Sequence, residues 1–178
     1  MAPDKESNLL QDEWSAQLTT SGGIKLNVRP ASPADQQLVL DFLKSLDVQD
    51  LRFRVLAAVR PSKEIAQLFT AVDHTHVENL LAFDASDGRL AATAMIAAES
   101  SPDTAELAAV IRSDLRYKGI GRALLPYACD FAKARGYRLL ECIESNENRD
   151  FVTVEEEFGF EARSHPGDPT LTIVSKVL

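Results

Sequence analysis

One strand–loop–helix segment constrains the fold more than any other part of the sequence. The pattern predicts a strand at 106–112, a loop that contains Gly119 and Gly121, and an amphipathic helix at 120–135 that ends before Gly136. Glycines at a helix start let a ligand approach the backbone closely. The first N–H groups of a helix lack partners within it and carry about half a positive charge, so the segment predicts an anion-binding site.

The charge of this loop is opposite to that of the whole chain. Residues 112–122 contain four cations and one anion, a net charge of +3, whereas the whole chain has a net charge of −8. A cationic loop on an acidic chain favours a small ligand that carries phosphate. The acidic total argues against general nucleic-acid binding, which requires a basic surface. The residues also leave open a simpler interpretation, a glycine turn flanked by solvated cations.

The loop does not match the two common nucleotide-binding fingerprints. A P-loop requires G-x-x-x-x-G-K-[ST], which does not occur, and a dinucleotide fingerprint requires a third glycine where Leu124 stands. Metal binding is also disfavoured, because His74 and His76 lack a further spaced ligand group. Cys129 and Cys142 lie in apolar segments without metal-type spacing, which argues against both a zinc module and a disulfide framework.

The chain is expected to form an N-terminal tail and one α+β domain. Residues 1–23 are hydrophilic and weakly patterned, with Trp14 and Leu18 available to dock a short helix, and residues 24–178 suit a single domain with one mixed sheet. The expected strands are 24–29, 77–83, 90–98, 106–112, 138–144, 160–163 and 171–177, and the expected helices are 33–46, 48–59, 62–69, 120–135 and 148–158.

No segment predicts a membrane span or an export signal. The longest apolar run, 90–98, has nine residues, far fewer than the roughly 20 that cross a bilayer. The N-terminus is polar and acidic and has no hydrophobic signal core. We therefore expect a cytoplasmic protein that has neither a membrane partner nor a nucleic-acid partner.

The loop and its surroundings resemble the acyl-CoA pyrophosphate loop of the GNAT superfamily of N-acetyltransferases. The resemblance is carried by the run 110–125, by Lys133-Ala-Arg-Gly-Tyr, and by Asn148 placed eleven residues before Gly159-Phe160. It extends over residues 24–178. Within the superfamily, the segments 27–30 and 51–54 look most like the domain attached to bacterial protein-lysine acetyltransferases.

The resemblance implies a GNAT-like acyl-CoA N-acyltransferase fold. Its central sheet is mixed and mostly antiparallel, is flanked by helices, and is splayed between the strands at 106–112 and 138–144. It also implies acetyl-CoA as co-substrate, and the spacing of the His and Cys residues leads us to expect no metal ion. The residues implied in cofactor binding are Ala109, Val110, Ile111, Arg116, Tyr117, Lys118, Gly119, Ile120, Gly121, Arg122 and Asn148.

Family members usually transfer the acetyl group by direct attack of a substrate amine on the thioester. Only about one alkyl ammonium in 2,500 is neutral at pH 7, so a base or a water relay helps. The resemblance makes Glu106 the catalytic candidate, with Glu99 in reserve, while a solvated carboxylate at a strand end is the alternative. Glu155 stands where many relatives carry a Tyr that protonates the CoA thiolate, and a carboxylate there is unfavourable unless it is protonated.

The resemblance and the charge together predict an N-acetyltransferase that acts on a primary amine. The acidic balance favours a protein lysine or a small cationic amine as acceptor. The alternative function is a non-catalytic acyl-CoA-binding regulatory module, which Glu155 in place of Tyr would favour. A homodimer is left open.

Overall fold

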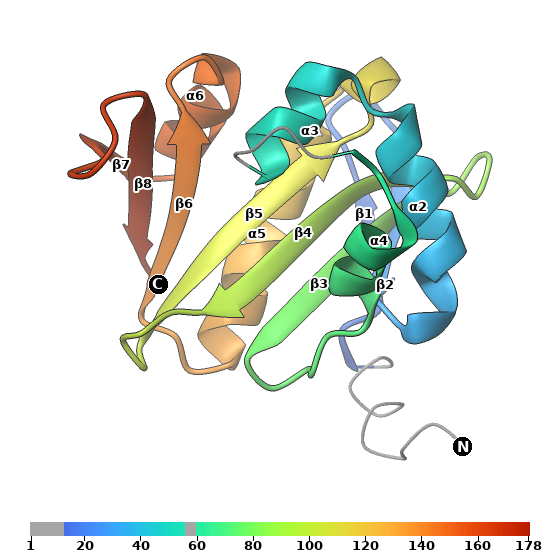
Figure 1. Ribbon diagram of the computed structural model, residues 1–178, viewed down its shortest axis with the longest axis horizontal. Coiled ribbons are helices and arrows are strands. Elements are labelled where there is room, and N and C mark those ends of the chain that lie inside the picture. Colours follow the sequence, from blue (N-terminus) through green and yellow to red (C-terminus); the bar gives the residue numbers. More distant parts are fainter. Residues whose placement is uncertain (1–12, 56–59) are drawn as a thin grey trace.

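The protein is built on a single eight-stranded sheet, seen in the computed structural model of Figure 1, which describes residues 13–55 and 60–178. The strands are β1 (Ala16–Thr19), β2 (Lys25–Pro30), β3 (Val77–Asp84), β4 (Leu90–Ala98), β5 (Thr104–Ile111), β6 (Leu139–Ser145), β7 (Glu161–Ser164) and β8 (Leu171–Val177). Their order is β1-β2-β3-β4-β5-β6-β8-β7. Only β5 and β6 pair in parallel. The predicted α+β architecture with a mixed, mostly antiparallel sheet is confirmed.

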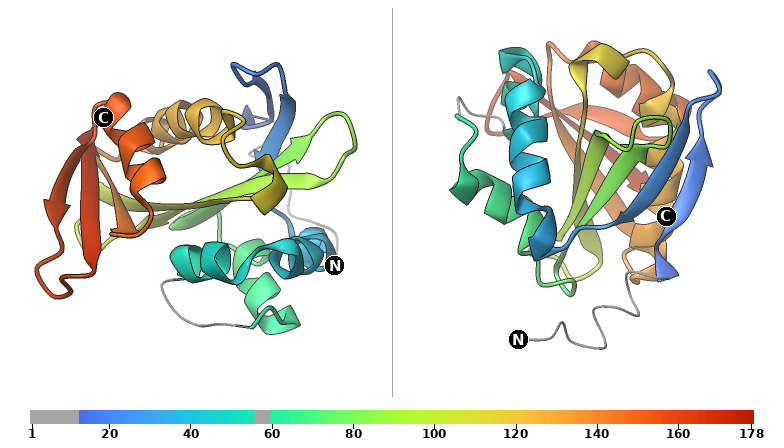
Figure 2. Two further views of the ribbon diagram at one scale, coloured as in Figure 1. Left: turned by 90° about the horizontal axis from the view of Figure 1, so that it is seen from above. Right: turned by 90° about the vertical axis from the view of Figure 1, so that its right-hand side faces the viewer.

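Helices cover both faces of the sheet, as Figure 2 shows from above. The helices are α2 (Gln36–Ser45), α3 (Val48–Val55), α4 (Lys63–Thr70), α5 (Ile120–Ala134) and α6 (Arg149–Glu157), with short 3-10 turns at Pro33–Asp35 and Ser113–Leu115. One face carries α2, α3 and α4, and the other carries α5 and α6. Each face has its own apolar core: Val39, Leu43 and Phe69 pack on the first, and Leu124 and Phe131 pack on the second. Burial of these side chains holds the helices on the sheet.

Strands β5 and β6 separate along their length. Their parallel pairing joins only Thr104–Glu106 to Leu139–Glu141, although both strands continue well beyond it. On its other edge β6 pairs with β8 over its whole length, so β6 is held in place while its side toward β5 opens. The resulting V is visible in Figure 1. The predicted splay between these strands is therefore confirmed, and it leaves the edge of β5 at 107–111 without a strand partner.

The sheet extends into the N-terminal segment that we expected to be a tail. Strand β1 pairs antiparallel with β2. Trp14, just before β1, packs edge-on against Phe131 and Tyr127 of α5, with ring centroids 4.8 and 5.9 Å away, and its carbonyl accepts a 2.8 Å hydrogen bond from the Tyr127 hydroxyl. A strand of four residues is too short for its alternating pattern to stand out in the sequence. Residues 14–19 are thus docked on β2 and α5, whereas residues 1–12, which belong to the expected tail or short helix, lie outside the described residues.

The other expected elements lie within a few residues of their observed positions. The helix expected at 48–59 ends at Val55 in the described chain, and 56–59 lie outside the described residues. No helix among the described ranges combines the length and the apolar character that crossing a membrane requires. Cys129 and Cys142 are buried free thiols.

Trp14→Ala should lower the free energy of unfolding by about 2–3 kcal/mol, because it removes a large aromatic side chain from the surface of α5. Urea unfolding followed by far-ultraviolet circular dichroism is the suitable measurement, since Trp14 is the only tryptophan in the chain. Trp14→Phe retains an aromatic ring and should recover most of the loss. A change of less than about 0.5 kcal/mol in Trp14→Ala would contradict the packing role.

Candidate active site

A cavity of about 520 Å³ lies between the end of β5, the start of α5 and helix α6. Its size is in the range of small-molecule sites. Its lining residues are Gln49, Asp50, Ala109, Val110, Ile111, Arg116, Tyr117, Gly119, Ile120, Gly121, Arg122, Glu147, Asn148, Asp150, Phe151, Thr153 and Val154. This set contains ten of the eleven residues that the resemblance implied for cofactor binding; only Lys118 is not among them. Residues predicted from separate parts of the sequence thus line one cavity.

The loop before α5 is shaped by a left-handed glycine. Gly119 has φ +82° and directly precedes the first residue of α5, whose initial N–H groups lack partners within the helix. A Cβ at this position would lie 3.1 Å from Ser21 Oγ, because the β1–β2 turn packs behind the loop. That turn is itself held by hydrogen bonds, including one of 2.9 Å from the Gly23 N–H to the Thr20 carbonyl. The N-terminal hairpin therefore supports the loop from behind.

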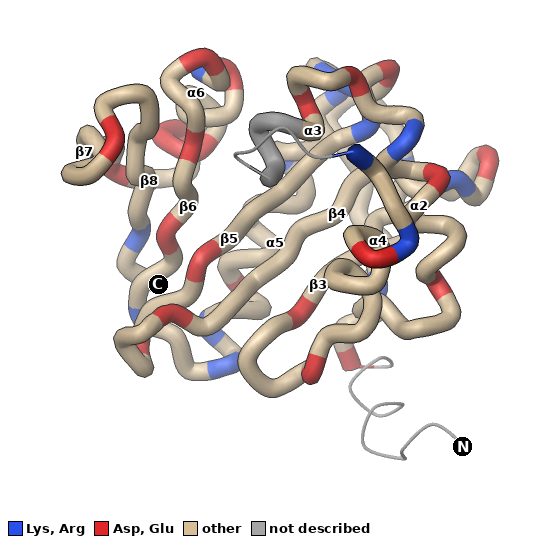
Figure 3. The backbone as a smooth tube through the Cα atoms, in the orientation of Figure 1, with Lys and Arg blue, Asp and Glu red and all other residues tan. Residues whose placement is uncertain are grey.

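Carboxylates pair with the arginines of the loop, and two of them come from elsewhere in the chain. The pairs are Arg112–Asp114, Arg116–Asp50 and Arg122–Glu157. Figure 3 shows acidic and basic positions interleaved around α3, α6 and the end of β5. The net charge of +3 that we counted along the sequence is consequently offset in space by Asp50 and Glu157. Attraction of an anion then rests mainly on the backbone N–H groups and the dipole of α5.

A tyrosine bridges the loop and helix α6 beside the cavity. The Tyr117 hydroxyl donates a 2.8 Å hydrogen bond to Asp150 Oδ2, and this bond raises the pKa of Tyr117. Tyr117 is a non-glycine residue in the left-handed region, with φ 59°, and 83% of its surface is exposed. A left-handed backbone costs energy at a residue other than glycine, and such strain clusters at active sites and ligand-binding loops.

Asn148 lies at the cavity, in the turn between β6 and α6. Its side-chain amide donates a 2.6 Å hydrogen bond to Glu144 Oε2, and its carbonyl accepts from the Phe151 N–H at 3.2 Å. The Phe151 ring in turn lies against Gly121, where a Cβ would be 3.4 Å from the ring. Asn148 therefore holds the turn into α6, and Phe151 of this helix lies against the first turn of α5.

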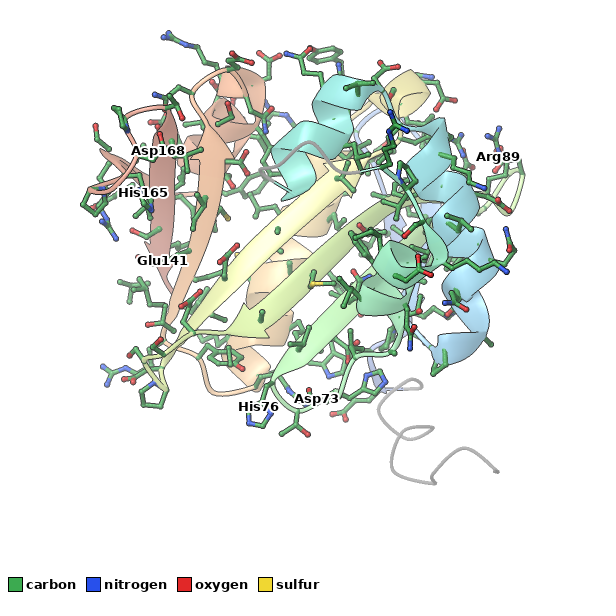
Figure 4. All side chains as sticks on the ribbon, viewed as in Figure 1. Asp73, His76, Arg89, Glu141, His165 and Asp168 are labelled. Carbon is green, nitrogen blue, oxygen red and sulfur yellow. The ribbon has the colours of Figure 1, made fainter. Side chains whose placement is uncertain are left out.

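The two candidate bases lie outside the cavity lining. Glu106 is half-buried on β5, in register with Ala97 on one side and with Glu141 on the other, roughly 10 Å along the strand from Ala109. Glu141 of β6 accepts from Arg163 of β7 at 3.1 Å, so its side chain reaches across β8, away from the splay, and Figure 4 labels it on that side. Glu99 is exposed in the β4–β5 turn, at the opposite end of β5 from the loop.

Glu155 is buried in α6 and does not line the cavity. Its side chain is 0% exposed, and neither carboxyl oxygen has a hydrogen-bond partner in the described chain. Burial raises its pKa to about 7. Burial, with the nearby Glu155, also raises the pKa of the Cys142 thiol well above its ordinary value. Both groups belong to the packing between α6 and β6, which suits Cys142 as a core residue.

Several lining residues of the cavity were not among those implied by the sequence. Asp50 reaches it from α3, more than 60 positions before the loop, so no local pattern could indicate it. Phe151 and Val154 lie three residues apart on α6, and this helical spacing was the only signal that they share a face.

The other motifs noted in the sequence lie apart from this cavity. His76 pairs with Asp73 at 3.0 Å in the turn before β3, as Figure 4 shows. Across residues 13–55 and 60–178, no group of three or more His, Cys, Asp or Glu residues is placed to hold a metal ion.

Known proteins similar to this chain share both the sequence pattern and the fold. The model of the acetyltransferase (GNAT) family matches residues 46–160. The GNAT domain of S. lividans PAT is 21% identical, with a TM-score of 0.85 over 93% of this chain and 98% of that chain. A GNAT-family acetyltransferase from Streptococcus pneumoniae is 22% identical, with a TM-score of 0.68 over 86% and 99%. Spermidine N-acetyltransferase from Vibrio cholerae, in complex with CoA and spermine, is 16% identical, with a TM-score of 0.70 over 85% and 95%.

Gly119→Ala should weaken CoA binding at least tenfold, because the new Cβ strains the left-handed backbone and crowds Ser21, which displaces the loop N–H groups. Isothermal titration calorimetry measures the affinity. Gly88→Ala is the matched control, since Gly88 has φ +69° with open space around its Cβ position and lies away from the cavity. Equal losses in both variants, or no loss at Gly119, would contradict the assignment of the loop.

The free energy of unfolding should contain a component that falls as the pH rises from about 4.5 to about 7. Over this range the unfolded chain releases the Glu155 proton, whereas the folded chain, with the pKa raised from 4.5 to about 7, retains it. The full component is on the order of 3 kcal/mol. Urea unfolding at several pH values should show it in the wild type and not in Glu155→Gln. Identical pH slopes for the two proteins would argue against a buried, protonated Glu155.

Proposed function

The chain belongs to the acetyltransferase (GNAT) family, and we propose that it transfers an acetyl group from acetyl-CoA to a primary amine. The family match covers well over half of the chain. The observation that carries the proposal is the cavity at the open end of the β5–β6 splay. It brings the edge of β5 at 109–111 and the N-terminus of α5 to one small-molecule site.

The residues of the cavity fit an acyl-CoA. The edge of β5 beyond Glu106 has backbone N–H and C=O groups without a strand partner, and the amide groups of a pantetheine arm can pair with them. The first N–H groups of α5, with Gly119 and Gly121 allowing close approach, suit a pyrophosphate. Bound acetyl-CoA would supply the activated thioester. The chain itself binds the anion, orients the arm and holds the acceptor amine in position for attack.

We infer that the acceptor is cationic, either a protein lysine or a small amine. The chain is acidic overall, and Figure 3 shows acidic positions on β5 and β6 beside the splay. S. lividans PAT is a bacterial protein acetyltransferase, and the V. cholerae enzyme binds spermine, so relatives of both acceptor classes share this fold. Attraction of a cation to acidic positions near the site would raise its local concentration.

We propose Glu106 as the general base that removes a proton from the acceptor ammonium. It lies on the same strand as the lining residue Ala109, toward the closed end of the splay and beside Glu141. Glu99 stays the second candidate. Glu155, whose position suggested a non-catalytic module, does not line the cavity and has a pKa raised to about 7. It therefore places no carboxylate at the cavity wall, and this supports an enzyme over a binding module.

We also propose that the acetyltransferase domain comprises residues 24–178 with 13–23 as its N-terminal edge. Strand β1 pairs with β2, and Trp14 packs against α5, so the edge is part of the same sheet and core.

Glu106→Gln should reduce kcat for acetyl transfer by about 100-fold or more and leave CoA affinity within about twofold of the wild type, because only proton removal is lost. CoA thiol release, with lysine peptides, polyamines, aminoglycosides and free amino acids as acceptors, measures the rate. Glu141→Gln is the matched control, since it is the neighbouring carboxylate on β6 and pairs with Arg163. Full activity in Glu106→Gln would show that Glu106 is not the general base. Wild-type protein that binds acetyl-CoA but acetylates no acceptor would favour the binding module.

A further inference from the structure

Helix α3 is fastened to the loop before α5 by one aspartate. Asp50 is 6% exposed and accepts a 2.6 Å hydrogen bond from the Ser113 hydroxyl. The same carboxylate pairs with Arg116. The Ser113 oxygen also accepts from the Asp47 N–H at 3.1 Å. These contacts connect the first turn of α3 with the segment that leads into the anion-binding loop.

Asp50 and Arg116 both line the cavity. The guanidinium of Arg116 is therefore next to the site where phosphates would bind, and it is already paired with a carboxylate. A phosphate that interacts with Arg116 must share that cation with Asp50. The Asp50 carboxylate of α3 and the phosphate of the ligand would therefore compete for the same guanidinium.

Asp50 differs from the other carboxylates that neutralise this loop. The Arg122 and Glu157 side chains are 46% and 45% exposed, so water and salt screen that pair. The Asp50 side chain is 8% exposed, so its charge acts through a medium of lower effective dielectric. Glu157, moreover, is not among the lining residues. Among the described carboxylates that pair with loop arginines, Asp50 thus has both the position and the burial to influence a bound anion.

We propose that Asp50 competes with the phosphates of acyl-CoA for Arg116, so that cofactor binding and the attachment of α3 are linked. The linkage rests on the proposed function, because it requires an acyl-CoA in this cavity. Linkage is reciprocal: an anion that engages Arg116 loosens the hold of Asp50 on the loop, and a weaker hold tightens anion binding by the same factor. Asp50 is then a positioning residue that acts through Arg116. It lowers cofactor affinity and keeps α3, which supplies Gln49 to the cavity wall, attached to the loop.

The first test measures CoA affinity in Asp50→Asn by isothermal titration calorimetry at low salt. Asn is close in shape to Asp and can still hydrogen-bond with Ser113, so the substitution removes charge with little change in packing. We expect CoA to bind roughly threefold to tenfold more tightly, because the substitution removes one negative charge near the phosphates. Asp47→Asn is the matched control, because it removes the same charge one turn earlier from an exposed side chain outside the cavity lining, and it should leave the affinity unchanged.

A double-mutant cycle with Arg116→Gln tests whether Asp50 acts through this arginine. In the Arg116→Gln background, Asp50→Asn should no longer tighten CoA binding. If Asp50→Asn still tightened CoA binding in that background, the Asp50 charge would act on the phosphates directly, and the proposed competition for Arg116 would be wrong. Unchanged or weaker CoA binding in the single variant Asp50→Asn would overturn it as well. Wild-type protein that fails to bind CoA at all would instead refute the proposed function, so the two failures are distinguishable.

Hydrogen exchange in the wild type gives an independent readout that does not depend on folding of a variant. Saturating CoA should speed exchange of the α3 amides at 48–55, because Asp50 gives up part of its contact with Arg116. Ser113→Ala, which removes the hydroxyl that holds Asp50, should shift CoA affinity in the same direction as Asp50→Asn. Slower or unchanged exchange in α3 on CoA binding would contradict the linkage.

Discussion

The short parallel pairing of β5 with β6 is the constraint on which the rest of the structure depends. Backbone N–H and C=O groups need partners, and past Glu106 the β5 edge no longer meets β6. Strand β6 tolerates the separation because β8 pairs with its other edge along its whole length. The opening therefore costs little on the β6 side. On the β5 side it creates a row of backbone groups next to the N-terminus of α5, which is the arrangement that an extended ligand ending in phosphates requires.

The sequence predicted the contiguous part of the cavity lining and missed the part assembled by the fold. Residues 109–122 lie in one run, and their chemistry follows from a strand, two glycines and a helix start. The charge of that run misled us, because Asp50 and Glu157 reach the arginines only through tertiary packing. Charges counted along a chain omit the partners that folding brings to them. For this reason the backbone groups of the loop were a better guide to the site than its charge.

Element positions were largely predictable, and the exceptions have physical causes. The apolar periodicity of α5 and the alternation of β2 were clear signals, whereas β1 has only four residues and takes its order from β2 and from Trp14 on α5. Three consecutive glutamates, 155–157, lie on α6. In an α-helix successive side chains are about 100° apart, so Glu155 turns inward while Glu156 and Glu157 remain exposed. Only the packing of α6 on β6 decides which of the three is buried.

The splay also divides the sheet into two parts that are hydrogen-bonded to each other only where Thr104–Glu106 pair with Leu139–Glu141. One part contains β1 to β5, and the other contains β6, β8 and β7. Strand β5 continues for five residues past Glu106, the last residue paired with β6, and this unpaired stretch is about 17 Å long. A rotation of about 5° at this point would move the far end of β5 by about 1.5 Å. The angle between these two parts of the sheet, rather than the length of any one strand, therefore sets the width of the opening between β5 and β6.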